Sequence, residues 1–242
     1  MGTHPMNPIY LVIDTETTGL PDDPSAHVVE LGAAMAINPS PNWYEKGEYS
    51  TFCSFVKPPV LTPEGLAISK KISGITEDQI RSAPTPDTVW RNFFIWVMRE
   101  FQKKGNIEYS HDPQWQSVLA WNAEFDETMV KKTFGPSLLE WRCAMKPFTS
   151  EFEKWAPRRR DGSARYFKLV TAAKFAGFEW EGKAHRADAD ALMTLRLHIA
   201  RLGGRIEVDA TPRMFNPMTE RLEGKTALIG AGAARHAKRG SK

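Results

Sequence analysis

Residues 9–20 read IYLVIDTETTGL, and the interpretation of the whole chain starts from this stretch. Its first five residues are apolar and rich in β-branched side chains, which predicts a fully buried strand. Asp14 and Glu16 come next, and residues two apart in a strand point to the same face. Two carboxylates beside a buried strand raise each other's pKa unless a cation neutralises them. The pair is therefore either a ligand set for a divalent cation or the solvated end of a strand.

The remaining pattern predicts one α/β domain with a mixed sheet. Turn residues end the first strand, and Pro, Asn and Gly at 38–47 predict a hairpin loop between two further strands. Farther along, apolar residues recur at helical spacing, so strands come to alternate with helices. The expected elements are strands at 28–37, 51–56 and 118–121, and helices that begin at Pro63 and Pro86 or span 124–133, 169–175 and 187–202.

Composition excludes several classes of protein. The chain has 242 residues, of which 41% are hydrophobic, and a formal charge of +3, which fits a folded domain rather than a disordered chain. No apolar run approaches the roughly 20 residues that cross a bilayer. Residues 1–8 lack an apolar signal core, so we expect a cytoplasmic protein with no membrane partner. Cys53 and Cys143 lie far apart, which excludes a disulfide framework and a cysteine-rich zinc site.

Charge is distributed unevenly along the chain. Residues 201–242 carry nine Lys or Arg against four Asp or Glu, which leaves the preceding residues slightly acidic. Gly203 and Gly204 break the last expected helix, and the residues after them show little periodicity. We therefore expect a folded domain over residues 1–202 and a flexible basic tail over 203–242 that could contact nucleic acid or a protein partner.

Three more candidate residues stand near the starts of expected helices. Asp126 lies in a first turn, where a carboxylate also suits the helix dipole. His185 precedes the final helix and Asp190 lies in its first turns, a pattern that an ordinary surface helix also produces. Neighbouring acids are alternatives for any role or for a helix cap: Glu124, Glu127 and Asp188.

Together these residues form an ordered set of motifs. In this order the chain resembles the DEDDh exonucleases, the DnaQ-like family that includes polymerase proofreading subunits and small 3′→5′ DNA and RNA exonucleases. The resemblance covers about residues 8–202 and implies a ribonuclease H-like α/β fold, with a central five-stranded mixed sheet flanked by helices. Many members have His-Asn in the second motif where this chain has Trp121-Asn122, a change that leaves every metal ligand in place. The matching segments are Asp14-Thr15-Glu16-Thr17-Thr18-Gly19-Leu20, residues 29–33, Ser73-Gly74-Ile75-Thr76 with Ala83-Pro84, Asn122-Ala123-Glu124-Phe125-Asp126 and His185-Arg186-Ala187-Asp188-Ala189-Asp190.

The resemblance implies a role for each motif residue. Asp14, Glu16, Asp126 and Asp190 would gather two divalent metal ions, Mg²⁺ or Mn²⁺. His185 would be the general base that accepts a proton from the attacking water, a role that suits an imidazole near neutral pH. Other motif residues would contact the terminal nucleotides of the substrate: Thr15, Thr17, Thr18, Leu20, Ile75, Asn122 and Phe125.

The implied activity is a metal-dependent 3′→5′ exonuclease that releases nucleoside 5′-monophosphates, with the 3′ end of single-stranded DNA as the expected substrate. The alternatives are a proofreading or accessory subunit of a DNA polymerase, docked through the tail, and an RNA 3′→5′ exonuclease. Such activities serve DNA replication and DNA repair. A non-catalytic nucleic-acid-binding module is the alternative least in keeping with the complete set of five residues.

A basic loop is the remaining feature. Arg158-Arg159-Arg160, with Lys154 and Arg165, precedes the helix expected at 169–175. Such a cluster either contacts the phosphate backbone of a nucleic acid or is an ordinary solvated loop, and the sequence leaves both open.

Overall fold

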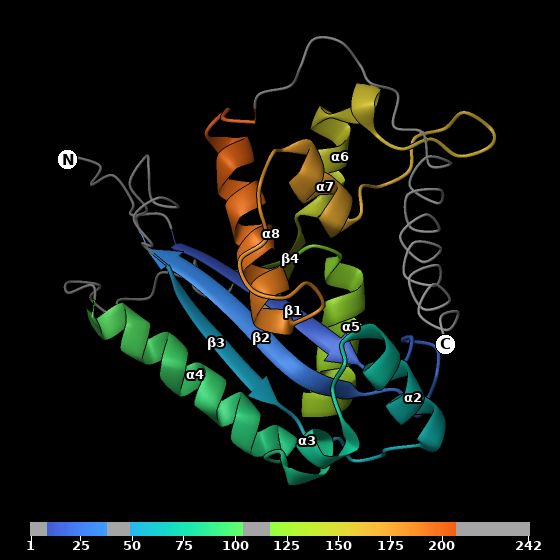
Figure 1. The fold of residues 1–242 in the computed structure, drawn as a ribbon. Coiled ribbons are helices and arrows are strands. Elements are labelled where there is room, and N and C mark those ends of the chain that lie inside the picture. Colours follow the sequence, from blue (N-terminus) through green and yellow to red (C-terminus); the bar gives the residue numbers. More distant parts are fainter. Residues whose placement is uncertain (1–8, 38–48, 104–116, 207–242) are drawn as a thin grey trace, which may run out of the picture.

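The computed structural model describes residues 9–37, 49–103 and 117–206, and Figure 1 shows a sheet covered by helices on both faces. The five strands lie in the order β3-β2-β1-β4-β5. The first three are antiparallel neighbours, whereas β4 pairs parallel with β1 and β5 parallel with β4. The sheet is therefore mixed, which confirms the expected fold class. The strands are β1 (Ile9–Thr17), β2 (Val28–Ile37), β3 (Ser50–Phe55), β4 (Ser117–Ala120) and β5 (Glu140–Cys143).

Helices pack on the two faces of the sheet. One face is covered mainly by α4 with help from α5, and the other by α8 (Figure 1). The described helices are α2 (Pro63–Ile72), α3 (Glu77–Ser82), α4 (Pro86–Lys103), α5 (Ala123–Phe134), α6 (Met145–Glu151), α7 (Leu169–Phe175) and α8 (Ala187–Leu202), and a 3₁₀ turn, η2, spans Glu153–Trp155. Among the described residues, no helix is long and apolar enough to cross a membrane.

Alternation along β1 decides which of its side chains meet α8. Leu11 and Ile13 pack in the core under α4, whereas Val12 packs in the core under α8. Successive side chains of a strand point to opposite faces, so Asp14 and Glu16 share the face of Val12. Both carboxylates therefore lie on the side of the sheet that α8 covers.

Gly32 of β2 allows α8 to approach the sheet closely. Gly32 pairs with Asp14 in the β1–β2 register, and a Cβ atom on it would lie 2.0 Å from the carbonyl carbon of Ala187. Any side chain at this position would push the first residue of α8 away from the sheet. The glycine thus brings the start of α8 next to the carboxylates of β1.

Several elements agree with the sequence-based expectations. The bounds of β2, α7 and α8 match, and β1 continues through the acidic residues to Thr17 instead of ending with the apolar run. The sequence did not locate β5, α3 or α6 individually. The expected hairpin loop at 38–47 and the tail from residue 207 lie outside the described residues. Ile206 is 9% exposed and packs against the core under α6 and α7.

Candidate active site

Four carboxylates from three separate elements meet in one cavity of about 680 Å³. Asp14 and Glu16 come from β1, Asp126 from the first turn of α5, and Asp190 from the first turns of α8. The first and the last of these acids, Asp14 and Asp190, are 176 residues apart in the sequence. The fold therefore brings together side chains that are distant along the chain. The neighbouring acids considered as alternatives, Glu124, Glu127 and Asp188, do not line the cavity.

A buried hydrogen bond connects β1 to α5 in the wall of the cavity. The hydroxyl of Thr15 donates to Oδ1 of Asp126 at 2.8 Å. Asp126 is 4% exposed, although it belongs to a first turn that is open to solvent at Glu124. A buried carboxylate needs such a partner, and the bond fixes the direction in which the Asp126 side chain points.

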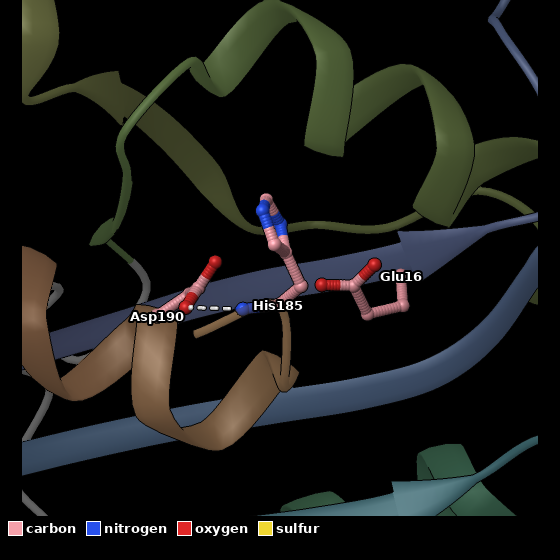
Figure 2. A group of neighbouring side chains, drawn as sticks. All are labelled: Glu16, His185 and Asp190. Atoms are coloured by element: carbon pink, nitrogen blue, oxygen red, sulfur yellow. Dashed lines mark hydrogen bonds between the residues drawn. The ribbon is translucent and has the colours of Figure 1, made fainter. Parts of the chain in front are cut away.

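His185 stands beside Glu16 and Asp190, at the end of the segment that leads into α8. Figure 2 shows the three side chains gathered together, with His185 between the two carboxylates. One ligand atom from each residue lies within 4.8 Å of those of the other two. The backbone N–H of His185 donates to Oδ1 of Asp190 at 3.2 Å. His185 is also the one non-glycine residue with positive φ, +63°, among the described residues.

Burial and mutual repulsion change the acidity of this cluster. Burial raises the pKa of Glu16 to about 7, and the negative charge of Asp190 adds to the effect. Burial also raises the pKa of Asp126 to about 7 and that of Asp190 to about 7, while the Thr15 hydroxyl opposes the shift at Asp126. Burial and then the charge of Asp126 raise the pKa of Asp14 well above its usual range.

This donor set fits a divalent cation. Carboxylate oxygens are the ligands that hard divalent cations prefer, and a bound cation would offset the negative charges that are buried and crowded together in this cavity. Because Glu16, His185 and Asp190 already place ligand atoms close together, little movement is needed for a cation to bind. The acidic cluster can therefore hold metal ions.

The raised pKa values predict how the stability of the metal-free protein varies with pH. Between about pH 4 and pH 7 the folded protein keeps protons on Glu16, Asp126 and Asp190 that the unfolded chain has released. The free energy of unfolding should therefore fall as pH rises through this range, by roughly 4 kcal/mol for one carboxyl shifted from about 4 to about 7. Urea unfolding at a series of pH values in chelator measures this fall.

Metal ions provide the control for that experiment. They bind the ionised carboxylates, so saturating Mn²⁺ should raise the stability most at pH 8 and least at pH 5. A metal-free stability that climbs steadily from pH 5 to pH 8 would show that these carboxyls are not held protonated in the folded state.

The structure places most of the expected substrate-contact residues in the cavity wall, but not all of them. Thr15, Thr17, Leu20, Asn122 and Phe125 line the cavity.

Two of the expected contacts lie elsewhere. Thr18 is 2% exposed, and its hydroxyl accepts a hydrogen bond from the backbone N–H of His27, so it holds the loop after β1 instead of facing the cavity. Ile75 is also 2% exposed and packs with Val29 and Ile80 in a small core cluster. The Ile75 side chain therefore faces the core in this structure and does not line the cavity.

The cavity wall also includes two residues of α2 for which the sequence predicts no role. Ile68 and Ile72 line the cavity, and Ile72 is 53% exposed at the end of its helix. Leu169 at the start of α7 and Trp121 after β4 complete the apolar lining. An isoleucine that falls off the buried face of a short helix is a signal that the sequence itself contains.

The basic loop forms a small hydrogen-bonded hairpin. Arg158 and Ala164 form an isolated antiparallel bridge, and the N–H of Arg159 donates to the carbonyl of Ser163 at 2.8 Å. All of the arginine side chains of this loop are exposed, and within the described part of the chain none of them pairs with a carboxylate. The hairpin therefore presents a group of exposed arginines to solvent.

Comparison with known proteins gives a family and a relative. Residues 11–112 match the RNase T family model, which is described as an exonuclease. The chain is 31% identical over 196 residues to an uncharacterized exonuclease, CP81, of Escherichia phage 186, and the match covers 76% of this chain and 84% of the relative.

Solved structures share the fold at low sequence identity. The nuclease domain of 3′hExo, a DEDDh family member bound to rAMP, is 17% identical with a TM-score of 0.58, and the match covers 86% of this chain and all of that one. A full-length 3′-exonuclease is 18% identical with a TM-score of 0.58, and the match covers 86% of this chain and 64% of that one. Escherichia coli Exonuclease I in complex with a dA16 oligonucleotide is 18% identical with a TM-score of 0.51. The match covers 86% of this chain and 42% of that larger chain.

Proposed function

Because the chain belongs to the DEDDh-type exonucleases of the ribonuclease H-like superfamily, we propose that it removes nucleotides from the 3′ end of single-stranded DNA and releases nucleoside 5′-monophosphates. The observation that carries the proposal is the assembly of Asp14, Glu16, Asp126 and Asp190 in one cavity with His185 beside them. A module that only binds nucleic acid would have no need to concentrate four carboxylates where a phosphate must approach.

Each residue of the cluster has a distinct task in this proposal. The four carboxylates hold two divalent cations, Mg²⁺ or Mn²⁺. When bound, these cations supply Lewis-acid charge that offsets the negative charge developing on the reacting phosphate. His185 accepts a proton from the water that attacks phosphorus, and its exposed position leaves the imidazole accessible to that water. The bond from phosphorus to the 3′-oxygen breaks, and that oxygen leaves with the shortened strand.

The apolar part of the cavity wall suits the terminal base. Leu20 is 65% exposed, and it lines the cavity together with Ile72 and Phe125. An apolar or aromatic surface accepts the face of every base, so we expect no strong sequence preference. A base can reach this surface only when it is unpaired, which favours single strands over duplexes.

End-labelled oligonucleotides test the direction and the substrate. With a 5′ label, a 3′→5′ exonuclease produces a ladder of shortening products, whereas a 3′ label appears at once as free monophosphate. Matched single-stranded DNA and RNA, with Mg²⁺, Mn²⁺ or chelator, identify the preferred sugar and the metal requirement. A 5′-labelled monophosphate as the first product, or equal rates in chelator, would overturn the proposal.

RNA is the second candidate substrate. The related folds include one enzyme in complex with rAMP and another in complex with a DNA oligonucleotide, so the fold accommodates both. The polymerase-subunit alternative depends on the basic tail, whose residues beyond 206 are outside the described structure. Co-purification with a polymerase that requires residues 207–242 would support it.

We further propose that the basic loop contacts the phosphate backbone upstream of the 3′ end. Replacing both Arg159 and Arg160 with Ala removes two exposed charges from the loop. If each contacts one phosphate, the slope of log binding constant against log salt should fall by about 1.4, and KM on a 20-nucleotide strand should rise severalfold at moderate salt with kcat unchanged. Binding titrations at several salt concentrations measure the slope.

A matched pair of substitutions on the opposite side of the sheet controls for net charge. Arg91 and Arg99 are exposed on α4, and changing both to Ala removes the same charge far from the cavity. An equal effect of the two double variants would show that overall charge, and not the loop, governs binding.

A further inference from the structure

Glu30 is a fully buried carboxylate near the start of β2. Nε of Arg186 donates to Oε1 of Glu30 at 2.9 Å and to Oε2 at 3.1 Å, and Nη2 of the same guanidinium donates to Oε1. The backbone N–H of Ala187 donates to Oε2 at 3.0 Å, and the thiol of Cys53 lies 3.4 Å from Oε1. The carboxylate is therefore hydrogen-bonded on both oxygens, as a buried charge requires.

This carboxylate also caps a helix from outside. Arg186 is the N-cap residue of α8, and its own side chain makes no capping bond. Glu30 instead accepts the first free N–H of the helix, at Ala187, and places a negative charge at the positive end of the helix dipole. The residue that follows His185 is thereby fixed to the sheet by both its side chain and the next backbone amide.

The segment that carries His185 is held at its other end as well. Arg196 of α8 donates to the carbonyl of Glu179 at 3.1 Å, pairs with the carboxylate of Glu181 at 2.9 Å and lies over the ring of Phe178. Between these two anchors, His185 has a left-handed φ of +63°, a conformation that costs energy for a non-glycine residue and persists only where the surroundings enforce it.

We propose that Glu30 and Arg186 are positioning residues, which hold the His185 imidazole over the carboxylate cavity and so set the rate of proton transfer. The inference rests on the proposed function, in which His185 is the general base. Arg186 itself does not line the cavity, and its guanidinium is engaged by Glu30, so it acts through the backbone that it shares with His185. It also neutralises Glu30, whose charge otherwise adds to the repulsion around Asp14.

Arg186→Lys is the primary test, because it keeps the charge and loses the two-pronged contact with Glu30. We expect kcat on single-stranded DNA to fall about 10- to 100-fold, as for other residues that orient a reacting group, while KM changes less than about twofold. Arg201→Lys is the matched control, because Arg201 also lies on α8 and pairs with Glu151 at 3.0 Å, at the end of the helix far from His185. The control should keep the parent rate.

The same substitution in a His185→Asn background separates positioning from general damage. If Arg186 acts through His185, Arg186→Lys should lower the residual rate of His185→Asn by less than about twofold, because the group being positioned is already gone. An equal proportional loss in both backgrounds, or an unchanged kcat in Arg186→Lys alone, would overturn the proposal.

Hydrogen exchange tests the same idea without using catalysis, so it remains informative if the proposed nuclease activity fails. In Arg186→Lys the backbone amides of His185 and Ala187, which donate to Asp190 and Glu30, should exchange at least about tenfold faster. The amide of Gly203, which donates to Ile199 at the far end of α8, should be unaffected. Unchanged exchange at His185 and Ala187 would show that the pair does not hold the segment.

Discussion

Asp14→Asn is expected to lower the rate of nucleotide release by about 10³-fold. Asp14 lies on the central strand β1, and its pKa is raised by burial and by the charges of Asp126, Asp190 and Glu16. It is thus a buried carboxylate on which the charges of the other three acids act. Asparagine keeps its shape and removes the charge, so the loss should come from weakened cation binding.

The stability of the same variant distinguishes this explanation from misfolding. In the metal-free protein Asp14→Asn removes a source of repulsion, so its melting temperature should equal or exceed that of the parent near pH 8. The stabilisation by added Mn²⁺ should shrink sharply. Asp87→Asn, an exposed carboxylate on α4, is the matched control and should behave as the parent does in both assays. An active Asp14→Asn enzyme, or one that melts well below the parent in chelator, would contradict this account.

The sequence could predict that Asp14 and Glu16 share a face, because a strand has a strict period of two residues. It could not predict which helix covers that face. This depends on Gly32, where the absence of a side chain lets α8 contact β2, and a lone glycine within an apolar strand does not reveal its neighbour 155 residues later. Which helix lies over the carboxylates of β1 is therefore decided by tertiary packing.

The elements missed by the sequence are short and locally ambiguous. β5 has four residues, Glu140–Cys143, in which charged side chains alternate with Trp and Cys. This segment forms a strand because it pairs in parallel with β4. α6 contains Pro147 in its first turn, a position that helices tolerate but that reads as a turn in isolation. In both cases a neighbour distant in the sequence decides the local structure.

Two of the expected substrate-contact residues lie outside the cavity wall for the same reason. Thr18 and Ile75 stand next to motif residues in sequence, yet their side chains turn into the protein. The sequence does contain a signal that Glu30 needs a partner. Every residue of β2 is buried, and Glu30 is its one charged residue. Such a carboxylate needs a partner. The sequence can show that need, but Arg186, 156 residues away, becomes identifiable only in the structure.

His185→Asn is expected to lower kcat by about 10²- to 10⁴-fold near neutral pH with little change in KM, because proton transfer to a positioned base contributes a factor of that size. Asparagine is the informative replacement at this position. His185 has a φ of +63°, and asparagine tolerates the left-handed region better than alanine does, so the backbone leading into α8 can keep its path. Asparagine cannot accept the proton at a comparable pH.

The stability of the variant completes the argument, because a proton acceptor can be removed without loss of the fold. His185→Asn should unfold at the same urea concentration as the parent, so that the loss of rate reports the missing base. His198→Asn serves as a control, since burial lowers the pKa of His198 to about 4 and its ring packs edge-on against Tyr10, away from the cavity. If His185→Asn retains the parent rate, another group accepts the proton, and the role assigned to the His185 segment and to its Glu30–Arg186 anchor must be abandoned.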